Sequence, residues 1–349
     1  MSVTDFEQRR NSILELIIEA YLASASPVGS AFVARKLRSS LSPATIRNIM
    51  GDLEEDGYLS QPHTSAGRVP TDQGYRFYVD SVMEVPRISP DELRQIERLI
   101  QPAEIELELL LERASAALAS LSQQAGFAVV PTVKQSRVRQ VEFVPLGVRR
   151  VLCVLVANDE MVASHVVEIV EPMTRDEAVA LARFINTELA GLSCRELMES
   201  LERRMLAERD SFYHVVKRSL DLLQLALSTE PEERFVLEGT SALVSQPEFA
   251  NDPRKAYALL KGLDAEELLL SRLRQDIASD GIRVRIGREV QVPGLEACSY
   301  LAAPVVAGDT VVGGIGVLGP RRMDYPRLRS LVEGVSRCIT ERLTRWDER

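Results

Sequence analysis

The sequence predicts an α+β protein in which a mainly helical N-terminal part precedes two strand-rich blocks separated by a helical block. Through the first 87 residues, apolar side chains recur at the i, i+3, i+4, i+7 spacing of helices. Valine-rich runs typical of strands include Val138–Leu146, and strands resume at Phe235 after the helical segment Thr174–Ser228. This order indicates one α+β domain with another inserted into it. We therefore predict three domains: residues 1–87, residues 88–171 with 235–349, and the insert 172–234.

Three helices are predicted at the N-terminus. The first lies within residues 9–25 and has a wide apolar face, and the second begins with Ser30 as its N-cap. The third begins with Ser42 as N-cap and Pro43 at the first helical position, where the missing N–H of proline costs nothing. Gly57 ends this helix.

The third helix has one apolar and one polar face. Its apolar stripe has the spacing i, i+3, i+4, i+7 and consists of Ile46, Ile49, Met50 and Leu53. The opposite face carries Ala44, Arg47, Asn48, Gly51 and Glu55. Arginine pairs bidentately with guanine and asparagine with adenine, and a small residue such as Ala44 lets the backbone approach the groove floor. The acidic residues Asp52, Glu54, Glu55 and Asp56 are confined to the far end, so this pattern predicts a helix that reads DNA with its first turns.

Basic residues surround this predicted reading helix. Residues 30–51 contain four basic side chains and no acidic one, which is typical of a surface that contacts DNA phosphates. The predicted DNA-contacting residues in the two helices are Arg35, Lys36, Arg38, Ser42, Ala44, Thr45, Arg47 and Asn48. The alternative interpretation is a helical hairpin with an ordinary solvated face.

A two-stranded wing is predicted directly after the third helix. Tyr58–Gln61 and Arg68–Pro70 are short strand-like runs on either side of a turn-rich tip, residues 63–67. The wing candidates for contact with the DNA backbone or minor groove are His63, Thr64, Ser65 and Arg68. A closing helix is then expected from Thr71, and residues 85–90 read as a linker. Together these elements predict a winged helix-turn-helix domain that binds double-stranded DNA.

Two blocks of sequence resemble the bacterial HrcA heat-inducible transcription repressors. They are SPATIRNIMGDLEEDGYLSQPHTSAGRVPTDQGYRFYVD, which begins at Ser42, and GGIGVLGPRRMDY, which ends at Tyr325; QPEF at residues 246–249 also fits. The resemblance spans nearly the whole chain. It implies a dimeric winged-helix repressor of chaperone operons that acts at an inverted-repeat operator, CIRCE, with the chaperonin system as modulator. It further implies a GAF-like outer domain and an inserted α/β dimerisation domain.

Beyond residue 87 the sequence gives several local signals. Capping boxes are predicted at Ser89/Glu92, Thr174/Glu177 and Ser193/Glu196. Apolar residues of the segment 107–121 step by four and three, which predicts a helix pair within the chain or with a second subunit. Further strands are expected at residues 151–156, 161–170, 282–286, 299–306 and 311–318, with a last helix over 325–342.

The net charge of −9 agrees with a DNA-binding protein only if the basic residues are grouped. Residues 1–87 contain nine Lys and Arg against eleven Asp and Glu, a net of −2, so −7 falls on the remainder. A local basic surface on an acidic protein can bind specifically while limiting non-specific adhesion.

Catalytic, metal and membrane functions are not expected. The four cysteines are widely separated and have no C-x-x-C pair, so they indicate reduced thiols in a cytosolic protein. A DNA-binding repressor is expected to be cytoplasmic and nucleoid-associated. The three histidines lack partners at metal-ligand spacing, and no common catalytic motif occurs, so we predict no cofactor and no enzymatic activity. No apolar run approaches the ~20 residues of a membrane span. The rival function is a ligand-sensing winged-helix regulator with an effector bound in the GAF-like domain, which fold analogy alone supports.

Overall fold

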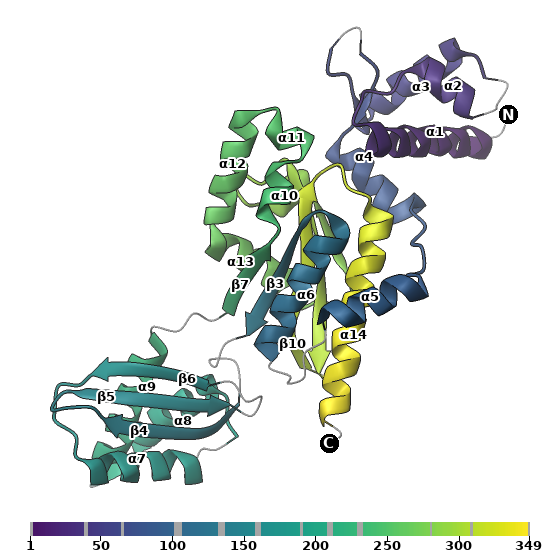
Figure 1. Cartoon of the computed structure of the whole chain (residues 1–349). Helices are drawn as coiled ribbons and strands as arrows, with labels where there is room; N and C mark the ends of the chain where they lie inside the picture. The colour runs from purple at the N-terminus through teal and green to yellow at the C-terminus, as the bar shows by residue number, and fades with distance from the viewer. Residues whose placement is uncertain are drawn as a thin grey trace. The chain divides into compact units, whose positions relative to one another are not determined.

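The computed structural model has the mixed helices and strands of an α+β protein (Figure 1). It divides into two compact units. The first unit comprises Met1–Gln101, Arg113–Ala128 and Leu237–Arg349, and the second comprises Pro102–Glu112 and Val129–Val236. The residues that the structure describes are 3–37, 41–63, 66–100, 107–131, 137–157, 162–188, 191–207, 212–228, 233–279, 281–307 and 310–347.

The first unit begins with three helices and a short hairpin, close to the predicted positions. The helices are α1 (Val3–Ser24), α2 (Ser30–Lys36) and α3 (Pro43–Glu55), and the hairpin pairs β1 (Leu59–Ser60) with β2 (Val69–Pro70). The apolar stripes of α1 and α3 are buried together with Val33 of α2. Helix α4 (Asp72–Phe77) and the π-helical turn η1 (Tyr78–Val82) follow, and Thr71 caps α4 by accepting the Gly74 N–H at 3.2 Å.

The remainder of this unit is built on a five-stranded sheet with the order β7-β3-β10-β9-β8, in which β3 continues past the unit limit at Ala128 and β7 begins before the limit at Leu237. Strand β9, which lies between β10 and β8, is buried from Cys298 to Ala303, as expected of a strand covered on both faces. Helices α13 and α14 pack against β9 and β10. The strands are β3 (Ala125–Pro131), β7 (Glu233–Glu238), β8 (Arg283–Ile286), β9 (Cys298–Ala307) and β10 (Thr310–Pro320). The helices are α5 (Pro90–Ile100), α6 (Leu107–Ser122), α10 (Thr240–Val244), α11 (Pro247–Ala250), α12 (Pro253–Asp264), α13 (Glu266–Ile277), the 3-10 turn η2 (Gly287–Val290) and α14 (Tyr325–Asp347).

Helix α6 packs on strand β3, and the predicted helix pair, within the chain or with a second subunit, stays a prediction. A Cβ atom placed on Gly126 of β3 would lie 2.0 Å from the Ser115 carbonyl oxygen and 2.8 Å from the Ala119 nitrogen. Only glycine allows so close an approach of the two backbones. The apolar stripe of α6 is therefore the buried face of a helix on a sheet.

The second unit contains a three-stranded antiparallel sheet with the order β4-β5-β6 and three helices on one of its faces (Figure 1). The strands are β4 (Val138–Pro145), β5 (Arg150–Ala157) and β6 (Val162–Glu168), and the helices are α7 (Arg175–Glu188), α8 (Cys194–Ala207) and α9 (Phe212–Ser228). Alternate strand residues such as Val141, Cys153 and Val167 share one core with Leu181, Leu197 and Leu223 of the helices.

This shared core differs from the predicted domain boundary at residue 172. The prediction assigned residues 88–171 to the outer domain, whereas Val129–Val236 belongs to one compact unit that includes β4, β5 and β6. Each of these strands alternates in burial, and α7, α8 and α9 cover the buried face. A boundary at residue 172 would separate the strands from the helices that bury them.

All three predicted capping boxes are present. Ser89, Thr174 and Ser193 each accept the backbone N–H of the glutamate three residues on, and that glutamate accepts the N–H of the cap. The hydrogen bonds from each cap lower the pKa of Glu92, Glu177 and Glu196. Among the described helices, none combines the length and apolar character needed to cross a membrane.

Candidate nucleic-acid interface

Helix α3 presents the polar face that the sequence predicts. The Ser42 hydroxyl accepts the Thr45 N–H at 3.1 Å and lies 3.0 Å from the Thr45 hydroxyl, so these two residues fix the start of the helix. Gly57 has the left-handed φ of +83° that ends it, and the Tyr58 N–H bonds the Leu53 carbonyl at 2.9 Å. The stripe Ile46, Ile49, Met50 and Leu53 is buried, whereas Ala44, Arg47, Asn48 and Glu55 are exposed.

The exposed cations near the start of α3 are unpaired. Arg35 and Lys36 at the end of α2 and Arg47 of α3 are exposed, and within the described part of the chain their side chains make no hydrogen bond or ion pair. The candidate Arg38 lies outside the described residues. Unpaired arginine and lysine side chains are available to replace the counterions of a phosphate backbone.

The acidic end of α3 holds neighbouring elements together. Glu54 forms an ion pair with Arg68 of the hairpin, with 2.7 Å between Oε2 and Nε, and Asp56 pairs with Arg10 of α1. The Arg10 guanidinium also lies over the Tyr58 ring, 5.7 Å from its centroid. These pairs neutralise negative charge that would otherwise repel DNA phosphates.

The hairpin is anchored through the backbone of Val28. The N–H and carbonyl groups of Val28 and Arg68 bond each other at 2.9 Å, and a Cβ on Gly67 would lie 2.4 Å from the Val28 carbonyl. The Arg68 side chain is only 17% exposed and faces Glu54, so this wing candidate stabilises the hairpin instead of projecting from it. His63 is exposed at the tip, and Thr64 and Ser65 lie outside the described residues.

The predicted cap of α2 is wrong in one detail. Gly29 occupies the N-cap position, no side chain caps the helix, and Ser30 is the first helical residue and is buried. The two hydrogen bonds between Val28 and Arg68 fix the chain immediately before Gly29, so the long-range pairing decides where the helix begins.

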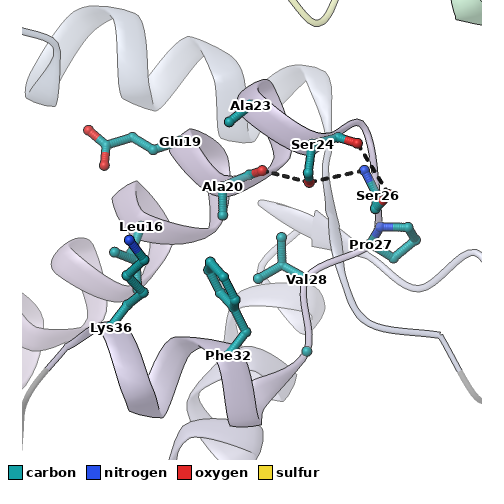
Figure 2. Close-up of a pocket in the computed structure, with 11 residues that line it drawn as sticks. Leu16, Glu19, Ala20, Ala23, Ser24, Ser26, Pro27, Val28, Phe32 and Lys36 are labelled. Carbon is teal, nitrogen blue, oxygen red and sulfur yellow. Dashed lines mark hydrogen bonds between the residues drawn. The ribbon is translucent and has the colours of Figure 1, made fainter.

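A shallow apolar recess of about 500 Å³ lies between α1 and α2 (Figure 2). Figure 2 shows the Phe32 ring between Ala20 and Val28, with Glu19 and Lys36 at the edge. The Ser24 hydroxyl donates to the Ala20 carbonyl at 2.8 Å and accepts the Ser26 N–H at 3.3 Å. The recess therefore offers hydrocarbon surface and no group arranged for catalysis.

Neither a metal site nor a reactive thiol is found among the described residues. Within the described ranges, no three His, Cys, Asp or Glu side chains are grouped so as to hold a metal ion. Burial raises the pKa of the Cys153 and Cys298 thiols to about 12, so both are protonated at neutral pH.

Comparison with known proteins gives the family. The family model of the HrcA protein C-terminal domain matches residues 108–328. The heat-inducible transcription repressor HrcA of Geobacter sulfurreducens is 34% identical over 341 residues, which cover 98% of this chain and 99% of the relative. The protein of the same name from Symbiobacterium thermophilum is 34% identical over 335 residues, which cover 96% of this chain and 98% of the relative.

A solved structure shares the fold. The crystal structure of a hypothetical protein determined at 2.2 Å resolution matches with a TM-score of 0.60 and 23% identity, and the match covers 99% of both chains. Transcription repressors such as these two relatives act by binding DNA. The relatives therefore also place this chain in a non-enzymatic family. The chain belongs to the HrcA family of heat-inducible transcription repressors.

Proposed function

We propose that this chain represses heat-shock chaperone operons by binding the inverted-repeat operator CIRCE as a homodimer. The observation that carries the proposal is the exposed face of α3 with Arg47 and Asn48, together with the exposed cations Arg35 and Lys36 of α2, which make no hydrogen bond or ion pair with any described residue. The relatives are named heat-inducible transcription repressors, which supports the same function. Repression would follow from occlusion, because a dimer clamped on an operator near a promoter denies that DNA to polymerase at the nucleoid.

In this proposal α1, α2, α3 and the β1/β2 hairpin form a winged helix-turn-helix domain. Helix α3 would enter the major groove with its first turns, where Ala44, Arg47 and Asn48 are exposed and Ser42 and Thr45 hold the helix start. Arg35, Lys36 and Arg38 would contact phosphates, and the tip residues His63, Thr64 and Ser65 would lie along the backbone or minor groove. Arg68 would position the tip through Glu54.

The remaining chain would form a GAF-like domain with a dimerisation domain inserted into it. We place the insert at the second unit, Val129–Val236, because β4, β5 and β6 share its core. The outer face of this sheet supports a role in dimerisation. Val144, Val162 and Val166 on it are 41%, 62% and 54% exposed, and Val166 and Val144 both stand opposite Leu152 of the central strand. So much exposed aliphatic surface is typical of a face that a partner covers.

Arg47→Ala is expected to weaken binding to the cognate operator by about 1–3 kcal/mol and to relax the preference at one base position. Lys36→Ala should weaken binding to cognate and to random DNA alike. It should also lower the slope of log K against log salt by about one. Fluorescence anisotropy with both DNAs at several salt concentrations separates the two effects. Arg337→Ala, which removes an exposed arginine of α14, is the charge-matched control and should bind as the parent does. Parental operator affinity in Arg47→Ala would show that α3 is not the reading helix.

We also propose that the chaperonin modulates the repressor. A chain of 349 residues in two compact units is above the size at which folding intermediates become common, so its active fraction can depend on a chaperonin. Heat-damaged proteins would then compete for chaperonin, and the operons would stay derepressed until chaperonin was again in excess.

The active fraction after refolding should rise with chaperonin and fall again when an unfolded competitor protein is added. Operator binding is titrated at one constant temperature after refolding under the three conditions, and the active fraction is taken from the stoichiometric end point. Protein that was never unfolded, incubated with the same additions, is the control. Equal active fractions in all three refolded samples would eliminate this mechanism and favour direct melting of the repressor by heat.

A further inference from the structure

A polar cavity of about 580 Å³ lies within the first unit, where α4 meets the segments that surround the end of the five-stranded sheet. Tyr75 of α4, Glu248, Lys255 and Arg288 are among the residues that line it. The volume lies within the range of small-molecule sites, which is roughly 300–1,000 Å³.

The acidic side chains at this cavity are already paired. Asp72 accepts from Arg321 at 2.7 Å and from the Arg288 backbone N–H at 3.1 Å. Glu289 pairs with Arg76, and Glu248 Oε1 accepts from Arg322 at 2.5 Å.

Unlike those acidic side chains, two cationic side chains at the cavity lack a close partner of opposite charge among the described residues. The Arg288 side chain is exposed and makes no hydrogen bond or ion pair with any described residue. The Lys255 side chain is 56% exposed and its ammonium lies 3.8 Å from the Asp252 carboxylate, a distance at which a surface pair contributes little. The cavity therefore has an excess of positive charge at Arg288 and Lys255, which favours an anion.

Two buried polar atoms lack partners at the same place. Tyr75 is 2% exposed and its hydroxyl has no hydrogen-bond partner among the described residues, and Glu248 Oε2 is likewise buried and unpartnered there. Burial holds the pKa of Tyr75 far above its usual value, so its hydroxyl is a donor at any physiological pH. Buried polar groups are nearly always satisfied, and a ligand can supply the missing partners. Tyr75 needs an acceptor and the Glu248 carboxylate needs a donor.

We infer that this cavity binds a small organic phosphate that carries hydroxyl groups, such as a sugar phosphate. The phosphate would accept hydrogen bonds from Arg288 and Lys255, since a guanidinium fork matches phosphate geometry. A ligand hydroxyl, which is both donor and acceptor, would complete the hydrogen bonds of Tyr75 and Glu248. Neither the phosphate alone nor the neutral sugar alone satisfies both parts of the cavity.

The position of the cavity couples the ligand to the end of α3. Thr71, the cap of α4, donates to the Gly57 and Tyr58 carbonyls at 2.6 and 3.1 Å, directly after the end of α3. A ligand held by Tyr75 acts on the same short helix, so its binding free energy depends on how α4 is placed. A change in operator affinity follows by linkage, and this second step rests on the proposed function.

Ligand binding is tested on the full-length free protein. The midpoint of thermal unfolding is measured with inorganic phosphate, glycerol 3-phosphate, ribose 5-phosphate and glucose 6-phosphate, against glucose and against sodium chloride of equal ionic strength. At least one hydroxylated phosphate should raise the midpoint saturably, inorganic phosphate should bind at least about tenfold more weakly, and glucose should have no effect. The absence of a saturable shift with all four phosphate compounds would overturn the site.

Variants assign the binding to this cavity. For the phosphate compound that raises the midpoint, Arg288→Gln should weaken binding about tenfold or more, the size expected for the loss of a charge-assisted hydrogen bond. Tyr75→Phe keeps the buried ring, and should weaken the binding of the hydroxylated phosphate but not that of inorganic phosphate. Arg283→Gln removes an exposed arginine of β8 that does not line the cavity, and is expected to bind as the parent does. Equal affinity in the parent and Arg288→Gln would mean that the phosphate binds elsewhere.

The DNA step is measured separately with the same compound at saturation. Operator affinity should change by about fivefold or more in the parent, within the usual range of coupling between two sites, and should not change in Arg288→Gln. Unchanged affinity in the parent would refute the coupling while leaving the site supported by the unfolding data. A protein that binds no operator under any condition would refute the proposed function alone.

Discussion

A 5-bp insertion between the two half-sites of the operator is expected to abolish tight binding. A two-fold dimer presents two identical reading helices in fixed, opposed orientation, so it needs an inverted repeat with fixed spacing. About half a helical turn of extra DNA places the second half-site on the wrong side for one α3. The affinity should fall by about 10³-fold or more, towards the non-specific level.

The measurement is a mobility-shift titration with the native operator, the 5-bp insertion, a 10-bp insertion and a single half-site. The 10-bp insertion is the control on the DNA side, because it restores the rotational phase and changes only the distance. A protein that binds the 5-bp insertion or the single half-site as tightly as the native operator is not reading DNA as a rigid dimer.

The proposed dimer predicts the same loss of operator affinity when its interface is disrupted in the protein. Replacing both Val162 and Val166 with glutamate puts charge on the exposed face of β6 without touching the core. Light scattering should then give the mass of a monomer, and operator affinity should approach that of a half-site. Val179→Glu, at a residue of α7 that is 60% exposed, is the matched control and should remain dimeric.

The elements of the predicted DNA-binding face were accessible from sequence because their signals are local. The limits of α3 follow from a cap at Ser42, a proline in the first turn and a glycine that can adopt positive φ. The stripe of four apolar residues decides which face is buried, and it leaves Arg47 and Asn48 exposed. None of these features depends on a distant part of the chain.

The predicted roles of Ser30 and Arg68 required information that is not local. Ser30 is buried and is the first residue of α2, while Gly29 takes the N-cap position. The start of the helix is set there because the Val28 backbone pairs with that of Arg68, 40 positions along the chain. Arg68 is an accessible wing residue by sequence, but its side chain lies against Glu54 at the far end of α3. A charged residue in a turn-rich segment reveals its partner only when the fold is known.

The domain boundary was harder to predict for a related reason. The inward-facing apolar residues of strands such as β4 and β6 must be covered, but their sequence does not say by which helices. The change from strands to helices after Glu168 was therefore read as a domain boundary, although α7, α8 and α9 complete the core of those strands. Strand β3 was not predicted, because its short apolar run follows directly from a helix and has no alternating pattern.

The C-terminal part of the first unit contains a buried charge on which its stability should depend. Asp276 of α13 has a side chain that is only 2% exposed. Its carboxylate accepts from Arg285 Nε, which lies 2.9 and 3.1 Å from the two oxygens, from Arg285 Nη2, and from the Tyr300 hydroxyl at 2.6 Å. Burial alone would raise the pKa of this carboxyl, but the hydrogen bonds from Arg285 and Tyr300 and the guanidinium charge outweigh it, so the pKa is lowered.

Asp276→Ala is expected to lower the free energy of unfolding by about 3 kcal/mol at pH 7. Removing one partner of a buried pair costs about 3–5 kcal/mol, and the lower figure applies because the Arg285 side chain is 35% exposed. The variant leaves the Tyr300 hydroxyl without its acceptor and the guanidinium without its counterion. Tyr300→Phe, which removes one hydroxyl from the same cluster and keeps the carboxylate, should cost only about 1 kcal/mol. Urea unfolding followed by circular dichroism gives both differences.

The difference between the parent and Asp276→Ala should also depend on pH, with a defined sign. Because the folded pKa of Asp276 lies below its unfolded value of about 3.9, the ionised carboxylate contributes its full stabilisation above that value. As the pH falls through the folded pKa, the carboxyl becomes protonated in both states and this contribution disappears. The two proteins should therefore differ by a constant amount from pH 5 to pH 7 and converge as the pH is lowered below about 4. A difference that stays constant through the acid range would mean that the alanine variant loses packing only, and that the charge of Asp276 does not stabilise the fold.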